Sequence, residues 1–132
     1  MATARITREV PLPRKLWIGT YEYTVALVPH GDAGLAEDYG ATYSDDQRKA
    51  IFIDSSLDTR KRLEIVLHEL THAIVWTHDL ADVDSEEVTV NEETLCDRFG
   101  IAWSAFLLDN PRFQRWLTYT LNRIRKERKD GA

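Results

Sequence analysis

The sequence is poor in the residues that mark exported or membrane proteins. It contains a single cysteine, Cys96, which cannot form an internal disulfide bond and fits a reducing compartment better than an export route. The longest nearly apolar run, residues 101–108, is interrupted by Ser104 and is far shorter than a membrane span. The first five residues have no apolar core behind a basic start, so we expect no secretory signal. We therefore expect a cytoplasmic protein.

An excess of positive charge is also absent. The net charge of −5 argues against bulk electrostatic capture of nucleic acid, and we expect neither a nucleic-acid nor a membrane partner. Basic residues do gather near the carboxy terminus, where cations suit the dipole of a helix end. These residues, which we expect to be solvated, are Arg123, Arg125, Lys126, Arg128 and Lys129. With 132 residues, the chain has room for one domain, residues 1–132, with a core of about residues 14–128.

The first half of the chain predicts a small antiparallel sheet of three or four strands. Residues 21–27 alternate between apolar and polar types, which is the period of a strand, and residues 19–20 form a plausible turn before them. Residues 29–40 are rich in glycine and acids and read as a loop. Residues 41–43 and 50–53 then predict two further strands joined by a polar turn.

The second half predicts three helices, so the fold class is α+β. Asp58 or Thr59 can cap a helix that ends near Thr77. Its apolar residues repeat at intervals of three and four: Leu63, Val66, Leu67, Leu70 and Ile74.

Capping signals also mark the two later helices. Thr89 and Glu92 stand in capping-box spacing at the start of the second helix. Asn110 and Pro111 supply a cap and a preset first residue for the third. The residues expected to be buried in the second helix are Leu95, Phe99, Ala102, Trp103 and Phe106. Those expected to be buried in the third helix are Phe113, Trp116, Leu117, Leu121 and Ile124.

The first predicted helix contains the motif His68-Glu69-Leu70-Thr71-His72. Residues four apart on a helix differ in direction by about 40°, so both imidazoles face one point and can fill two of the four positions around zinc. Glu69 can then reach a metal-bound water as general base. The flanking residues 66–67 and 73–74 are uncharged, which is typical of a helix buried behind its metal. The alternative is a helix with two surface histidines and a salt-bridging glutamate.

A third protein ligand is required, and several residues compete for this position. His78 lies ten residues after His68, as in the long histidine motif of the metzincins, but Val75 stands where those proteins have glycine. A continuing helix would turn His78 about 120° away from His72. The connector acids are further candidates: Asp79, Asp82 and Asp84.

Glu92 and Glu93, at the start of the second helix, form the better pair of candidates. Glu92 already closes the predicted capping box, whereas Glu93 lies in line with Asp97 and Gly100. Asp97 could accept a hydrogen bond from the far nitrogen of a ligating histidine, and Gly100 would let the two helices approach closely. The alternative for Glu93 is an exposed first-turn acid favoured by the helix dipole. Glu92 and His78 stay open as ligands.

The sequence after Glu93, Thr-Leu-Cys-Asp-Arg-Phe-Gly, and the later Phe106-Leu107-Leu108 and Asn110-Pro111 resemble the ImmA/IrrE-type and related phage-encoded small metallopeptidases. The preceding Ile-x-Ile-Asp and Leu-His-Glu-Leu-x-His-Ala segments are also similar. The resemblance covers roughly residues 15–118 and implies a minimal zincin-like metallopeptidase fold. SprT-type proteases share the histidine motif but resemble this chain less, because no later histidine ligand matches.

The resemblance implies that His68, His72 and Glu93 are zinc ligands and that Glu69 is the catalytic acid–base. Asp97 matches the family's Asn or Asp four residues after the ligating Glu. The regulatory roles of larger members, which carry further domains, are not implied.

The expected function is a zinc-dependent metallopeptidase that hydrolyses peptide bonds in a peptide or protein substrate and binds one divalent ion, zinc or else manganese or iron. The substrate would lie extended along the strand of residues 41–43. Tyr43 and His30 are candidates to stabilise an oxyanion, Trp76 could line the pocket, and Cys96 is expected to pack between helices. The alternative is a non-catalytic interaction module in which a metal, or nothing, staples two helices.

Overall fold

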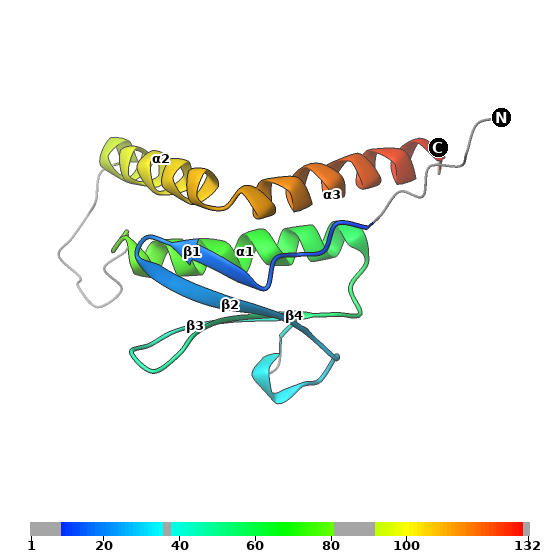
Figure 1. Ribbon diagram of the computed structural model, residues 1–132, viewed down its shortest axis with the longest axis horizontal. Coiled ribbons are helices and arrows are strands. Elements are labelled where there is room, and N and C mark those ends of the chain that lie inside the picture. The colour runs from blue at the N-terminus through cyan, green and yellow to red at the C-terminus, as the bar shows by residue number, and fades with distance from the viewer. Residues whose placement is uncertain (1–8, 36–37, 81–91, 131–132) are drawn as a thin grey trace.

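The structure, a computed structural model, describes residues 9–35, 38–80 and 92–130. Within these ranges, four strands precede three α-helices (Figure 1), so the predicted α+β class and order of elements are confirmed. The elements are β1 (Lys15–Ile18), β2 (Tyr21–Val28), the short 3-10 helix η1 (Ala33–Leu35), β3 (Gly40–Ser44), β4 (Lys49–Asp54), α1 (Thr59–Thr77), α2 (Glu92–Asp109) and α3 (Pro111–Asp130). No helix of the described ranges is long and apolar enough to cross a membrane.

The sheet is mixed, with the strand order β1-β2-β4-β3. The β1–β2 and β3–β4 pairs are antiparallel, but β2 and β4 are parallel, so the prediction of a wholly antiparallel sheet is wrong for this pair. After β2 the chain continues into β3, which lies two positions away from β2 in the sheet. The β3–β4 hairpin then places β4 between β3 and β2. The apolar run of residues 50–53 is typical of such a central strand. This topology places β3 at the edge of the sheet.

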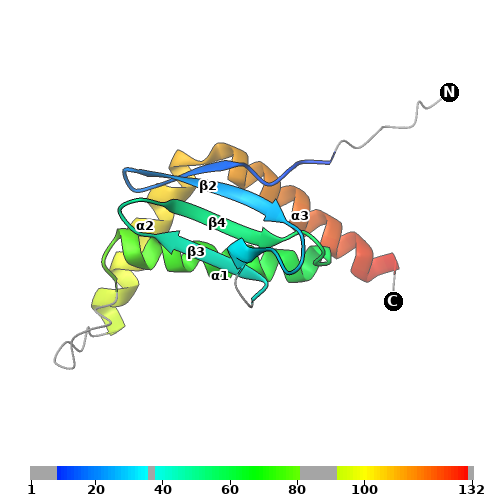
Figure 2. The same ribbon diagram turned by 90° about the horizontal axis from the view of Figure 1, so that it is seen from below.

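All three helices cover the same face of the sheet, as the view from below shows (Figure 2). Tyr23, Ile51 and Ile53 of the sheet share one core cluster with residues of all three helices. Members of the predicted stripes occupy it: Val66, Leu70, Ile74, Ala102, Phe106, Phe113 and Trp116 are buried. Burial of these side chains stabilises the helices on the sheet, because apolar contact rather than helix propensity supplies most of their stability.

The ends of the helices show which capping predictions hold. Asp58 caps α1, and its carboxylate accepts a hydrogen bond of 2.8 Å from the backbone N–H of Lys61, as predicted. The predicted capping box of α2 includes Thr89, which lies outside the described residues. Asn110 precedes α3 as predicted, but its side chain does not cap the helix. It accepts from the backbone N–H of Trp17 at 2.8 Å and donates to the Trp17 carbonyl at 2.7 Å, which ties α3 to the edge strand β1.

Candidate metal centre

Helix α1 presents His68 and His72 side by side on its exposed face. Their Nε2 atoms lie 3.2 Å apart, and their rings are inclined at 77° with centroids 4.8 Å apart. Two nitrogens that each lie about 2.0 Å from one tetrahedral zinc ion are separated by about 3.3 Å. The histidine pair therefore has the spacing of two zinc ligands, and both residues belong to one helix.

Glu69 lies between the histidines in sequence but faces the sheet. It is buried, with 6% of its surface exposed, and its Oε2 accepts a hydrogen bond of 2.5 Å from the Thr42 hydroxyl of β3. The same hydroxyl lies 3.0 Å from the backbone carbonyl oxygen of Glu69. Thr42 thus ties both the carboxylate and the backbone of this helical turn to the edge strand.

The approach of β3 to α1 is close because Gly40 has no side chain. A Cβ atom at Gly40 would lie 2.7 Å from Cγ2 of Ile65 and 2.9 Å from Cγ of Glu69. Gly40 and Thr42 point to the same side of the strand, since side chains alternate between the faces of a sheet. These two residues bring β3, an edge strand of the sheet, against Glu69 and the helix that carries the histidines.

Among the described residues, none joins the histidine pair as a third ligand. The described ranges contain no group of three or more histidine, cysteine, aspartate or glutamate side chains that could hold a metal ion. Glu93 is exposed in the first turn of α2, which both views place at the end of the molecule where α1 ends (Figures 1 and 2). The side chain of Glu92 and the acids Asp82 and Asp84 lie outside the described residues.

The face of α2 that carries Glu93 is turned to solvent. Asp97 is exposed and makes no hydrogen bond to His68 or His72 within the described part of the chain. A Cβ atom at Gly100 would meet nothing within 4 Å, so the prediction that this glycine allows close helix packing is wrong. Cys96 is exposed, and the prediction that it packs between helices is wrong as well. The reason is that α2 uses its opposite side, with Ala102 and Phe106, to enter the core.

His78 is the C-cap of α1 and Asp79 follows it, and among the described residues neither forms a metal-binding group with the histidine pair. His78 is half-buried, and its ring lies near Gly19 of the β1–β2 turn, where a Cβ atom would be 3.9 Å from its Cε1 atom. Gly19 has a positive φ of 61°, and its Cβ would also lie 2.8 Å from Cγ2 of Thr77, so both the turn and this contact require glycine. Asp79 follows with a φ of 52° and an exposed side chain.

Tyr43 lies on the other face of the sheet from α1. Its hydroxyl donates to the Gly34 carbonyl at 2.8 Å, and the Arg48 guanidinium carbon lies 3.5 Å from the centroid of its ring. Its neighbour Thr42 faces Glu69, so alternation along the strand turns Tyr43 away. The structure therefore removes Tyr43 from the candidates for an oxyanion-stabilising group at this site.

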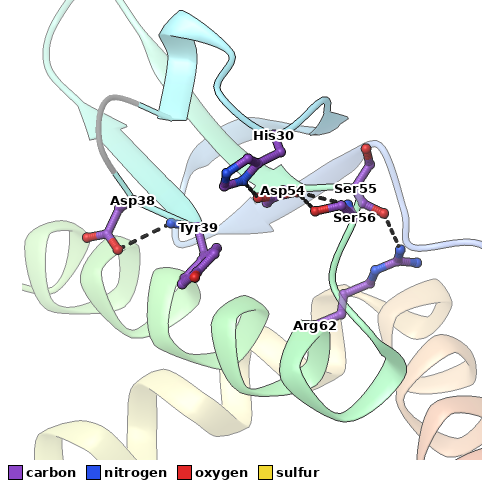
Figure 3. Close-up of polar contacts among 7 residues, drawn as sticks. All are labelled: His30, Asp38, Tyr39, Asp54, Ser55, Ser56 and Arg62. Carbon is purple, nitrogen blue, oxygen red and sulfur yellow. Dashed lines mark hydrogen bonds and ion pairs between the residues drawn. The ribbon is translucent and has the colours of Figure 1, made fainter.

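His30 takes part in a different cluster, at the carboxyl end of β4 (Figure 3). Its Nδ1 lies 2.6 Å from Oδ2 of Asp54, whose side chain is fully buried. Oδ1 of Asp54 accepts from the Ser56 hydroxyl at 2.6 Å and from the Ser56 backbone at 2.8 Å. The hydrogen bonds from Ser56 and His30 lower the pKa of Asp54 to about 2. Sequence reasoning missed this cluster, whose only signal is an acid at the end of a buried strand.

The depressed pKa of Asp54 predicts how stability depends on pH. Because the ionised carboxylate is favoured by the fold, its contribution is complete above its ordinary pKa of 3.8 and is lost as the pH falls through about 2. We expect Asp54→Asn to lower the urea midpoint at pH 7, and the difference from the wild type to shrink between pH 4 and pH 2. Asp46→Asn, at an exposed turn residue, is the control. A difference that stays constant down to pH 2 would contradict this account.

Beyond His72, the next turn of α1 leads to a small aromatic cluster. Trp76 is 43% exposed, and its ring centroid lies 5.5 Å from that of Tyr21. The ammonium of Lys49 lies 4.6 Å from the Trp76 ring and 5.1 Å from the Tyr21 ring. The exposed face of α1 therefore carries the histidine pair and then an aromatic surface with one cation. Neither Lys49 nor Tyr21 was singled out by the sequence motifs, because both belong to the sheet.

Comparisons of the chain with protein-family models, with curated proteins and with solved structures gave no match.

Proposed function

We propose that the protein is a zinc-dependent metallopeptidase of the kind that the ImmA/IrrE resemblance implies. The observation that carries the proposal is the 3.2 Å separation of the His68 and His72 Nε2 atoms on an exposed helix face. The motif supplies Glu69 between them, and a free sheet edge lies alongside. A zinc ion bound here would lower the pKa of its water towards about 7 and polarise a peptide carbonyl. The proposal includes a cytoplasmic location, in line with the lone cysteine.

In this proposal Glu69 moves the proton. Its carboxylate accepts a proton from the attacking water and delivers it to the leaving amine. The hydrogen bond from Thr42 holds Oε2 in place, so that the other oxygen is the one free to exchange the proton. Burial beside β3 limits the rotation of the carboxylate, which favours a fixed orientation.

The substrate in this proposal is an extended peptide that adds to β3. The strand is at the sheet edge, so the backbone groups on its outer side have no strand partner among the described residues. Such an edge binds an extended segment through main-chain hydrogen bonds. Thr42 joins β3 to the turn of α1 that carries Glu69, and the scissile bond of a peptide on this edge would therefore pass near the histidine-bearing face.

Replacing Thr42 by valine tests the role of this hydrogen bond. Valine keeps the shape of the side chain but loses the hydroxyl, so we expect kcat to fall by about tenfold while the zinc content stays unchanged. Thr24→Val is the matched control, because Thr24 is an exposed threonine of β2. If turnover by Thr42→Val equals that of the control, the threonine does not position the carboxylate.

The identity of the third zinc ligand is tested by measuring how much zinc each ligand variant retains. We propose Glu93, with Glu92 and His78 as the alternatives. After dialysis against a chelator-buffered zinc solution, Glu93→Gln is expected to retain much less zinc than the wild type, because a two-histidine site lacks one of the three protein ligands of a catalytic zinc centre. Glu92→Gln and His78→Asn should retain about one zinc per chain. Loss of zinc in either of these variants, with retention in Glu93→Gln, would reassign the ligand.

The proposed activity is tested by the cleavage of unfolded protein substrates in the presence of zinc, with the Glu69→Gln variant as the decisive comparison.

A further inference from the structure

A cavity lies away from the histidine motif, at the carboxyl end of β2. It has a volume of about 530 Å³ and lies between residues 9–14, β2, the start of α1 and the middle of α3. None of His68, Glu69 and His72 lines it. We call it the arginine cavity, because Arg14, Arg62 and Arg123 all contribute to its wall.

The charge of this wall is unusual for a protein with a net charge of −5. Three arginines line the cavity, and Glu9 is the one acid among the described lining residues. Glu9 is already paired with Arg123 at 3.0 Å, and Arg123 also binds Glu127 at 3.1 Å. Two guanidinium groups, those of Arg14 and Arg62, therefore remain without a carboxylate partner in the described part of the chain.

Arg62 provides the observation that points to a ligand. Its Nη2 donates to the carbonyl oxygen of Ser55 at 3.0 Å, which fixes the guanidinium below the end of β4 (Figure 3). Its Nε is buried and has no hydrogen-bond partner among the described residues. A buried N–H group without an acceptor is rare in folded proteins and destabilises them. Arg62 lines the cavity, so a ligand acceptor there would lie beside a guanidinium group that still has unused donors.

The rest of the wall is suited to an apolar group. Leu12, Val25 and Trp116 are buried residues that also line the cavity, and Tyr119 adds a second aromatic side chain. A volume of this size falls within the range of small-molecule sites, roughly 300–1,000 Å³. Guanidinium groups bind carboxylates and phosphates through paired hydrogen bonds.

We propose that the arginine cavity binds a small organic anion, with a carboxylate or phosphate head at Arg14 and Arg62 and an apolar body against Trp116. This inference does not depend on zinc binding or on peptide hydrolysis. It assigns a second function, ligand binding, to the face of the molecule where α3 covers the start of α1.

Binding is tested on the full chain by titration calorimetry and thermal unfolding with four probes: phenyl phosphate, benzoate, inorganic phosphate and the neutral benzyl alcohol. We expect saturable binding of phenyl phosphate or benzoate, and the stronger of the two identifies the head group. Inorganic phosphate should bind less tightly, since it lacks the apolar body, and benzyl alcohol should not bind. The bound probe should raise the unfolding temperature.

Two arginine variants locate the site. Arg14→Gln removes an exposed side chain with no hydrogen bond in the described structure, so it should leave the fold intact and weaken binding by about tenfold. Arg62→Met should do the same, with its own unfolding curve as the check of folding. Arg128→Gln, at an exposed arginine outside the cavity, is the control for net charge. Absence of saturable binding by any anionic probe, or equal weakening by Arg14→Gln and Arg128→Gln, would overturn the proposal.

Discussion

Glu69→Gln is expected to lower kcat for peptide hydrolysis by about 10²–10⁴-fold while zinc stays bound. The amide has nearly the shape of the carboxylate and can still accept the hydrogen bond from Thr42, but it cannot take a proton from water. Its effect is therefore specific to proton transfer. The measurement is cleavage of an unfolded protein substrate, made together with zinc content and the unfolding temperature for each variant.

The control for Glu69→Gln is Glu64→Gln on the same helix. Glu64 lies one turn before His68, is exposed and pairs with Lys61 at 3.6 Å, so its removal changes the charge of α1 without touching the buried carboxylate. We expect this variant to keep wild-type turnover. If Glu69→Gln also retains turnover, the proton is moved by another group. If the wild type binds zinc and cleaves nothing, the protein is the non-catalytic interaction module that the sequence left open.

His68→Asn and His72→Asn are each expected to weaken zinc binding by more than about 100-fold. Changes to residues that merely support a ligand already cost 10–100-fold in affinity, and loss of a ligand should cost more. Both side chains are exposed, so the variants should fold. The measurement is a competitive zinc titration against a chromogenic chelator.

Thermal unfolding provides a second test of zinc binding in His68→Asn and His72→Asn. Zinc that binds the folded state should raise the unfolding temperature of the wild type in a concentration-dependent way, and it should leave the two histidine variants unchanged. His78→Asn is the control, since His78 lies near the β1–β2 turn and apart from the pair. Equal zinc affinity in the wild type and both variants would show that the pair is not the metal site.

The parts of the fold that follow from local patterns could be predicted from the sequence. The cap at Asp58 and the spacing of Val66, Leu70 and Ile74 specify α1 directly. The direction of β4 could not be predicted in this way, because the same alternation of side chains fits a parallel and an antiparallel neighbour. Whether β4 runs parallel to β2 depends on the path of the segment between β2 and β3. Similarly, Asn110 was correctly placed at a helix start, but its bonds to Trp17 join residues 93 positions apart.

The candidate site likewise contains features that follow from a local pattern and features that depend on packing between elements. The facing imidazoles depend on one helix, so their spacing follows from the motif itself. The contact between Thr42 and Glu69 joins a strand to a helix, and no local pattern indicates it. The direction of the α2 face that carries Asp97 and Gly100 depends on how α2 packs, and the spacing of residues along that helix could not reveal that the face is turned to solvent.

We propose that His68 and His72 bind one metal ion through their Nε2 atoms. Zinc-edge X-ray absorption of the stoichiometric zinc complex, followed by a crystal structure of it, tests this most directly. We predict zinc within about 2.0–2.1 Å of both Nε2 atoms, with a carboxylate oxygen as a further protein ligand. A zinc-loaded crystal in which both imidazoles are free of metal would contradict the account.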